Sequence, residues 1–117
     1  MSDFVEFKLP FPPSVNRLWR ISGKRMYRSK NYTEWLRDCD FALKPYKGFH
    51  KISTSVAVTI LASRPDKRRR DLDNLAKPLL DVCQKYFIVD DSQVSKLEMY
   101  WVSEGEGVQI TIKGNYA

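Results

Sequence analysis

The chain has 117 residues, which supports one hydrophobic core but not two, so we expect a single domain over residues 1–117. A hydrophobic content of 43% excludes an intrinsically disordered chain, and no apolar run is long enough to cross a membrane. The formal net charge of +6 favours an anionic partner. The two cysteines and the single histidine lack zinc-ligand spacing, so we expect buried, reduced thiols and no zinc site.

The first half of the chain predicts one strand, a basic loop and one helix. Alternating apolar residues predict a strand over residues 4–9, ended by prolines. Residues 14–29 are loop-like, and a loop of that length is expected to contain short strand pieces or to contact a ligand. Apolar residues at helical spacing predict an amphipathic helix over residues 31–43. The loop region carries a cationic cluster: Arg17, Arg20, Lys24, Arg25, Arg28 and Lys30.

The second half predicts a strand, a helix and two further strands. Residues 54–62 alternate as a strand, and residues 74–86 follow a helical pattern in which Pro78 requires either a start near Lys77 or a kink. Residues 97–101 and 108–112 alternate as strands that we expect to pair as a hairpin. The order is therefore β-α-β-α-β-β, which indicates an α/β or α+β domain with a mixed sheet packed with two helices.

The most informative segment lies between the second predicted strand and the second predicted helix. Its run of cationic residues is followed directly by two carboxylates, Asp71 and Asp73, and then by a further cation, Lys77. In extended chain, residues two apart point to the same side, so both carboxylates could face one Mg²⁺. Cations attract phosphate, and a divalent ion offsets the repulsion between carboxylates and phosphate. The cationic run comprises Lys67, Arg68, Arg69 and Arg70.

Each of these residues also has an ordinary structural interpretation. Asp73 could cap the helix, Asp71 could pair with a neighbouring arginine, and Lys77 could pair with Asp73 at i, i+4. Asn74 could orient a metal-bound water or help to cap the helix. The basic clusters could be no more than a solvated face.

A second acidic turn and the tryptophans offer further candidates. Of the adjacent Asp90 and Asp91 we expect at most one to be a ligand, and the alternative is a solvated turn. Trp35 and Trp101 lie at core spacing. Trp19, inside the basic loop, is the better candidate for stacking on a base.

Taken together, three segments resemble the signature of the RusA family of Holliday junction resolvases. Residues 69–77 read RRDLDNLAK, Leu80-Asp81 follows, and residues 89–94 read VDDSQV. Residues 9–16, LPFPPSVN, are similar to that family's opening motif. The resemblance extends over nearly the whole chain.

The resemblance implies a homodimeric, magnesium-dependent endonuclease that resolves four-way DNA junctions by paired symmetric nicks, with Mn²⁺ as a substitute metal. The family's metal-binding aspartates fall on Asp71, Asp73 and Asp91, and its functional lysine falls on Lys77. We expect a cytoplasmic protein of a bacterial or phage-infected cell. The expected DNA-binding residues are Arg68, Arg69, Arg70, Lys67, Asn74, Arg17 and Arg20.

Two alternatives remain open at this point. A nuclease of the same fold could act on other branched, flap or single-stranded DNA. A non-catalytic basic DNA-binding protein could carry the carboxylates for structural reasons, and its DNA binding would then survive their loss.

Overall fold

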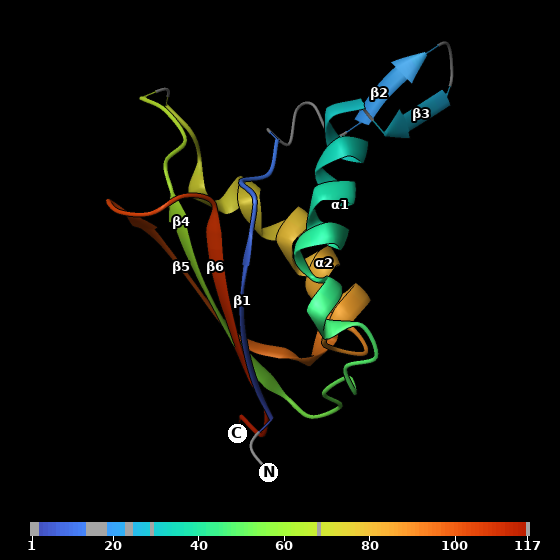
Figure 1. Cartoon of the computed structure of the whole chain (residues 1–117), viewed down its shortest axis with the longest axis vertical. Coiled ribbons are helices and arrows are strands. Elements are labelled where there is room, and N and C mark those ends of the chain that lie inside the picture. Colours follow the sequence, from blue (N-terminus) through green and yellow to red (C-terminus); the bar gives the residue numbers. More distant parts are fainter. Residues whose placement is uncertain (1–2, 14–18, 23–24, 29, 68, 117) are drawn as a thin grey trace.

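A mixed four-stranded sheet carries two helices on one of its faces (Figure 1). This is a computed structural model, which describes residues 3–13, 19–22, 25–28, 30–67 and 69–116; within 19–22 and 25–28 it describes the backbone alone. The α+β class, the mixed sheet and the two covering helices agree with the sequence prediction.

The strands of the sheet lie in the order β1-β6-β4-β5. Strand β6 is central and runs antiparallel to both β1 and β4, whereas β4 and β5 are parallel. A parallel pair needs a crossover, and the segment that contains helix α2 supplies it here. The bounds are β1 Phe4–Leu9, β4 Val56–Ser63, β5 Val94–Val102 and β6 Val108–Lys113.

The predicted hairpin between the last two strands is wrong. Strands β5 and β6 follow each other in the chain but lie on opposite sides of β4. The turn between them passes the end of β4, where the backbone N–H of Ser63 donates to the carbonyl of Gly107 (3.0 Å) and its hydroxyl to that of Glu104 (2.7 Å). Gly107 has a φ of 73°, and a Cβ there would lie 2.4 Å from the Leu9 carbonyl oxygen, so this crossing requires glycine.

The basic N-terminal stretch contains a second, two-stranded antiparallel sheet. Strand β2 (Trp19–Ser22) pairs with β3 (Arg25–Arg28). This confirms the expectation of short strand pieces in a segment too long for a plain loop. The predicted roles of Trp19 and Arg20 concern side chains outside the described residues.

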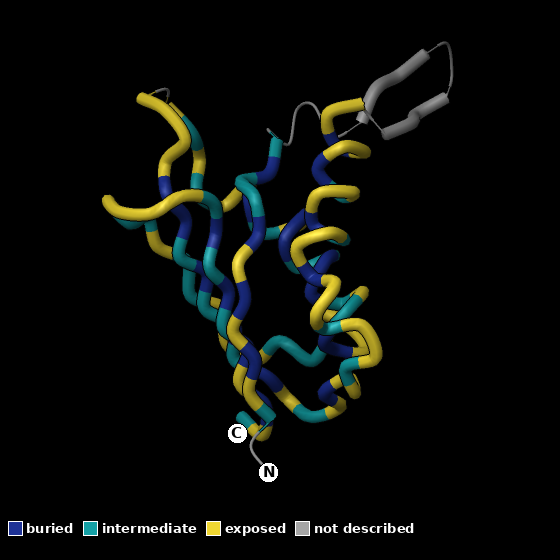
Figure 2. Tube along the Cα trace, viewed as in Figure 1, coloured by how far each residue is buried: buried dark blue, intermediate teal, exposed yellow. Residues whose placement is uncertain are grey.

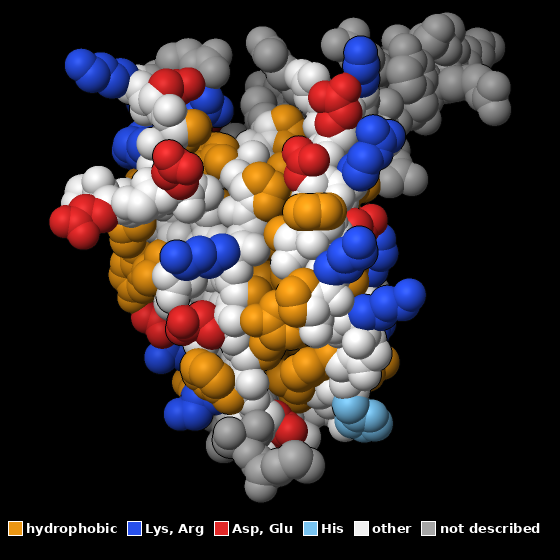
Figure 3. All heavy atoms as spheres, in the orientation of Figure 1, with side chains coloured by type: hydrophobic (Ala, Val, Ile, Leu, Met, Phe, Trp, Pro, Cys, Tyr) orange, Lys and Arg blue, Asp and Glu red, His pale blue; other side chains and the backbone are white. Residues whose placement is uncertain are grey.

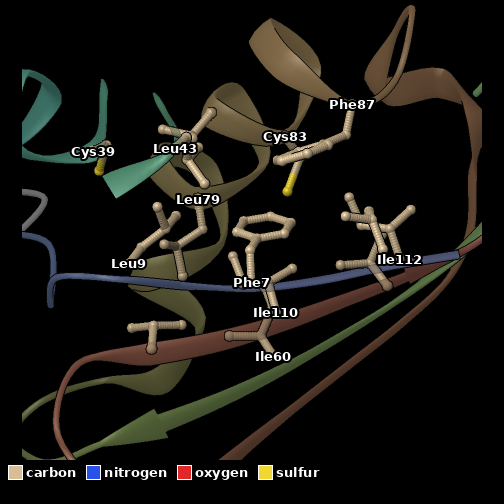
Figure 4. Packing of buried hydrophobic residues seen from close by; sticks show 14 of the residues in the cluster. Phe7, Leu9, Cys39, Leu43, Ile60, Leu79, Cys83, Phe87, Ile110 and Ile112 are labelled. Atoms are coloured by element: carbon tan, nitrogen blue, oxygen red, sulfur yellow. The ribbon is translucent and has the colours of Figure 1, made fainter. Parts of the chain in front are cut away.

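The core fills the space between the sheet and the helices (Figures 2 and 4). Helix α1 (Lys30–Ala42) buries Tyr32, Trp35 and Cys39, as its apolar spacing predicts. The indole N–H of Trp35 donates to the Pro10 carbonyl (2.9 Å), which ties the helix to the end of β1.

Across the core, the strands meet the second helix and the residue that follows it. The rings of Phe7 and Phe87 stack with centroids 4.3 Å apart. Cys83 lies in helix α2 (Ala76–Tyr86) and is fully buried. Both Cys39 and Cys83 are free thiols, as predicted, and burial raises the pKa of each to about 12. They are packing residues rather than nucleophiles.

Candidate active site

The first acidic pair lies where the loop after β4 meets the second helix. Asp71 has extended backbone (φ −91°, ψ 124°), but the chain then turns at once into a 3₁₀ helix, η3 (Leu72–Leu75), which contains Asp73. The prediction that extended chain carries both carboxylates is therefore wrong at Asp73. The turn is closed by the backbone N–H of Asn74, which donates to the Asp71 carbonyl (3.3 Å).

Both carboxylates are exposed, and neither has a partner among the described residues. Asp71 precedes η3 and Asp73 lies within it, yet neither side chain caps the 3₁₀ helix or the start of α2. Across the described part of the chain, neither carboxylate makes a hydrogen bond or an ion pair. The structural interpretations of both residues, as a cap and as an arginine partner, find no support in these contacts.

Helix α2 begins at Ala76, two residues before Pro78, and this start is compatible with the proline. Pro78 is the third residue of α2, inside the first turn, where a backbone N–H would have no partner within the helix. Lys77 beside it is highly exposed, with 77% of its side chain accessible, and its ammonium lies 3.4 Å from Asp81 rather than pairing with Asp73. An exposed pair at i, i+4 is weak, so Lys77 is free to reach an incoming anion.

The basic loop is fastened to the sheet by stacked rings and guanidinium groups. The Arg64 guanidinium lies 4.2 Å from the centroid of the Trp101 ring, and Trp101 stacks on Phe11 with centroids 6.1 Å apart. Arg70 lies 5.5 Å from the Phe11 ring centroid and forms an ion pair with Asp66 at 2.9 Å. Each ring of this aromatic pair therefore contacts one guanidinium group.

The predicted phosphate-binding residues of the loop thus differ in their surroundings. Lys67 and Arg69 of the loop and Asn74 of η3 are exposed. Arg70 is only 19% exposed, and its Nε is buried without a hydrogen-bond partner in the described structure. Arg68 and Arg17 lie outside the described residues.

The second acidic turn is built by a capping box. Asp90 precedes a short 3₁₀ helix, η4 (Asp91–Gln93), and its carboxylate accepts from the Ser92 N–H at 3.0 Å. Hydrogen bonds from Ser92 lower the pKa of Asp90. The carboxylate of Asp91 is exposed, with no partner among the described residues, while its backbone N–H donates to Oε1 of Gln84 (3.2 Å).

The two acidic turns lie at opposite ends of α2 (Figure 1). Asp71 and Asp73 precede the helix, whereas Asp91 is bonded to Gln84 in its last turn. A helix of 11 residues is about 16 Å long, which is far beyond the reach of one ion's ligand shell. Accordingly, the described residues of one chain contain no cluster of three or more metal-ligating side chains.

The donor set at the first turn suits a hard divalent cation. Mg²⁺ is commonly bound through one or two carboxylates, with water and substrate phosphate completing its octahedron. Asp71 and Asp73 supply two exposed carboxylates that have no ion-pair partner among the described residues, directly after the cations of the loop. Figure 3 shows that acidic and basic side chains are interspersed over the drawn face of the molecule, so the net positive charge does not form one continuous field there.

Comparison with known proteins identifies the family. The family model described as "Endodeoxyribonuclease RusA" matches residues 10–113. The chain belongs to the RusA family. A crossover junction endodeoxyribonuclease RusA of Enterobacteria phage HK97 is 32% identical over 109 residues, which cover 92% of this chain and 91% of the relative. The protein of the same name from Escherichia coli strain K12 is 33% identical over 107 residues, covering 89% of each chain.

Membership of the RusA family confirms the resemblance inferred from the acidic motifs. Sequence reasoning missed two side chains that support the second acidic turn, Gln84 and Gln93. The spacing of an aspartate and a glutamine three residues apart, Asp90 and Gln93, is a capping-box signal that could have found one of them. In the described residues, no helix is long and apolar enough to cross a membrane.

Proposed function

We propose that this protein is a divalent-metal-dependent endodeoxyribonuclease that resolves four-way DNA junctions by paired nicks, in the cytoplasm of a bacterial or phage-infected cell. The observation that carries the proposal is a pair of exposed carboxylates, Asp71 and Asp73, with no partner among the described residues, directly after a cationic loop in a chain of the RusA family. A protein that only binds DNA would gain nothing from such carboxylates beside its cations, because they repel the phosphates that the cations attract.

Asp71 and Asp73 would hold Mg²⁺, or Mn²⁺ in its place. The ion would supply Lewis-acid polarisation of the scissile phosphate and a more acidic water for in-line attack. Lys77, exposed and only weakly paired, would stabilise charge that develops on the phosphate. Arg69 and Lys67 would hold the backbone through its phosphates without reading bases, and Asn74 would add a polar contact.

Asp91 is proposed to join the metal site from a second copy of the chain. One chain keeps Asp91 at the far end of α2 from Asp73, so a site that uses all three carboxylates needs two chains. A two-fold dimer would present the Asp91 turn of each protomer to the Asp71–Asp73 turn of the other and so create two equivalent sites. Two sites in matching orientation suit a junction that must be cut twice.

The first test is cleavage of a labelled four-way junction in Mg²⁺, with linear duplex and flap DNA as controls and Asp71→Asn in parallel. We expect paired symmetric nicks in the junction, and a loss of at least about a hundredfold in rate in the variant, because one charged metal ligand is removed. Cutting of the flap or duplex but not of the junction would move the substrate to other branched DNA. Junction binding without cleavage by folded protein would contradict the nuclease proposal.

A second test asks whether the carboxylates face phosphate. Asp73→Asn should tighten junction binding in the absence of metal, because a negative charge near the DNA backbone is removed. Asp38→Asn is the matched control, since it also removes one exposed negative charge, but on helix α1 rather than in the acidic turn. Gel-shift titration in EDTA measures both. Weaker metal-free binding by Asp73→Asn would show that its carboxylate turns away from the DNA.

A further inference from the structure

We infer that Gln93 is a positioning residue for the Asp91 carboxylate, an inference that rests on the proposed role of Asp91 as a metal ligand. Gln93 makes four hydrogen bonds through one half-buried amide. Its Oε1 accepts from the backbone N–H groups of Val89 (2.7 Å) and Asp90 (2.8 Å). Its Nε2 donates to the carbonyls of Ile52 and Thr54, both at 2.8 Å.

These four bonds use the full capacity of the amide group. Two N–H groups surround the oxygen and two carbonyls surround the nitrogen, so only this orientation of the amide satisfies every partner. No other side chain of this size offers two acceptor sites and two donors in one plane. The requirement is therefore for glutamine itself rather than for a polar residue in general.

The partners of Gln93 belong to two segments distant in the sequence. One is the acidic turn, residues 88–91, and the other is the segment at residues 52–54 that leads into β4. The same two segments are joined by a parallel bridge between Ile52 and Ile88 and by the Ile52 N–H, which donates to the Phe87 carbonyl at 2.8 Å. Gln93 thus ties the acidic turn to the segment that precedes β4.

A second glutamine holds the turn from the helix. Oε1 of Gln84 accepts from the backbone N–H of Asp91 at 3.2 Å. The Asp90 carboxylate is occupied by Ser92, so Asp91 supplies the only carboxylate of this turn that is left without a partner in the described structure. The backbone of Asp91 is therefore held at its N–H by Gln84 and at its carbonyl by the Val94 N–H. Its carboxylate has no partner in the described structure, which is the arrangement expected for a preorganised ligand.

The test measures metal affinity directly, through the EPR signal of free Mn²⁺ during titration of the metal-free protein without DNA. The variants are Gln93→Met, which keeps the side-chain length and removes all four bonds, and Gln84→Met, which removes the single bond to Asp91. Gln109→Met is the matched control, because Gln109 is half-buried on β6 and its side chain makes no hydrogen bond to a described residue. Asp91→Asn shows how much Mn²⁺ affinity is lost when the carboxylate ligand itself is removed.

We expect about a tenfold loss of Mn²⁺ affinity in Gln93→Met, a smaller loss in Gln84→Met and none in Gln109→Met. In junction cleavage, the Mg²⁺ concentration for half-maximal rate should rise in parallel, and the maximal rate should return at saturating Mg²⁺. A merely structural role would lower the maximal rate or the unfolding temperature and leave the Mg²⁺ requirement unchanged. If Gln93→Met does not fold, Gln84→Met alone decides the question by the same two measurements.

The outcomes separate this inference from the proposed function. If Asp91→Asn weakens Mn²⁺ binding and both glutamine variants bind as wild type, the positioning role is wrong and the metal site stands. If Asp91→Asn also binds as wild type, or if the wild type binds no Mn²⁺, the proposed role of Asp91 fails, and the positioning role fails with it.

Discussion

Neighbouring residues of the basic loop have unlike surroundings, and this decides which of them is available to DNA. Arg69 is exposed, whereas Arg70 is held by Asp66 and lies against the Phe11 ring with most of its surface covered. The sequence alone assigned both arginines to phosphate. The surroundings leave Arg69 available for that role, whereas Arg70 instead fastens the loop to the sheet.

Substitution of each arginine by alanine should therefore have a different effect on DNA binding. Arg69→Ala should lower the slope of log K against log salt concentration by about 0.9, the value for one phosphate contact, whereas Arg70→Ala should leave the slope close to wild type. Arg70→Ala should instead lower the unfolding temperature, because the loop loses its ion pair and its ring contact. Salt-dependent junction binding measures the slopes, and equal slope changes in both variants would contradict the assignment.

At single residues, the sequence motifs predicted the family correctly but not the local geometry of the candidate site. The acidic motifs predicted the candidate ligands because aspartate spacing is visible in the chain. The 3₁₀ turn of η3 directly after Asp71 was not predicted. The bonds of Gln93 to Ile52 and Thr54 join residues 41 and 39 positions apart, and separations of that size leave no local pattern.

At the scale of elements, hydrogen bonds and an ion pair centred on Asp40 join the two helices. The carboxylate of Asp40 on α1 accepts from the ammonium of Lys85 at 2.9 Å and from the hydroxyl of Tyr86, both on α2. Burial acts to raise the pKa of Asp40, but the hydrogen bonds from Tyr86 and Lys85 outweigh it and lower the pKa. Burial together with the bond to Asp40 raises the pKa of Tyr86 to about 12 from an ordinary value of 10.0.

Tyr86→Phe should consequently destabilise the protein at pH 7 by about 1 kcal/mol, the usual net value of one hydrogen bond. The folded-state pKa of Tyr86 exceeds the unfolded value, so its contribution is complete below pH 10 and is lost as the pH rises towards 12. The difference between variant and wild type should thus shrink over that range, while the buried thiols affect both proteins equally. Urea unfolding across pH measures it, with Tyr116→Phe as control, and identical curves for Tyr86→Phe and wild type would contradict it.

Element positions were predictable, but strand pairing was not. The predicted first strand matches β1, and the first helix is shifted by one residue from the prediction, because apolar periodicity is a local property. The order of strands depends on which edge of β4 receives the last strand. That choice rests on the close approach of Gly107 to Leu9 and on the burial of β6 between two neighbours, and both are contacts between distant segments.

At the scale of the whole molecule, the length of α2 is the feature that governs the proposed mechanism. The helix places the Asp71–Asp73 turn and the Asp91 turn at its two ends, so one folded chain would supply only part of the proposed three-carboxylate site. Dimerisation would then be required for metal binding as well as for making two cuts. Activity should fall on dilution below the dissociation constant of the dimer.

The most direct measurement mixes two inactive variants, Asp73→Asn and Asp91→Asn, after joint unfolding and refolding, and follows cleavage of a four-way junction in Mg²⁺. If each site takes Asp71 and Asp73 from one chain and Asp91 from its partner, a mixed dimer contains one intact site. The mixture should then regain single-strand nicking that neither variant shows alone, without paired cuts. If all three carboxylates of a site came from one chain, both sites of the mixed dimer would be broken, and an inactive mixture of folded dimers would contradict the account.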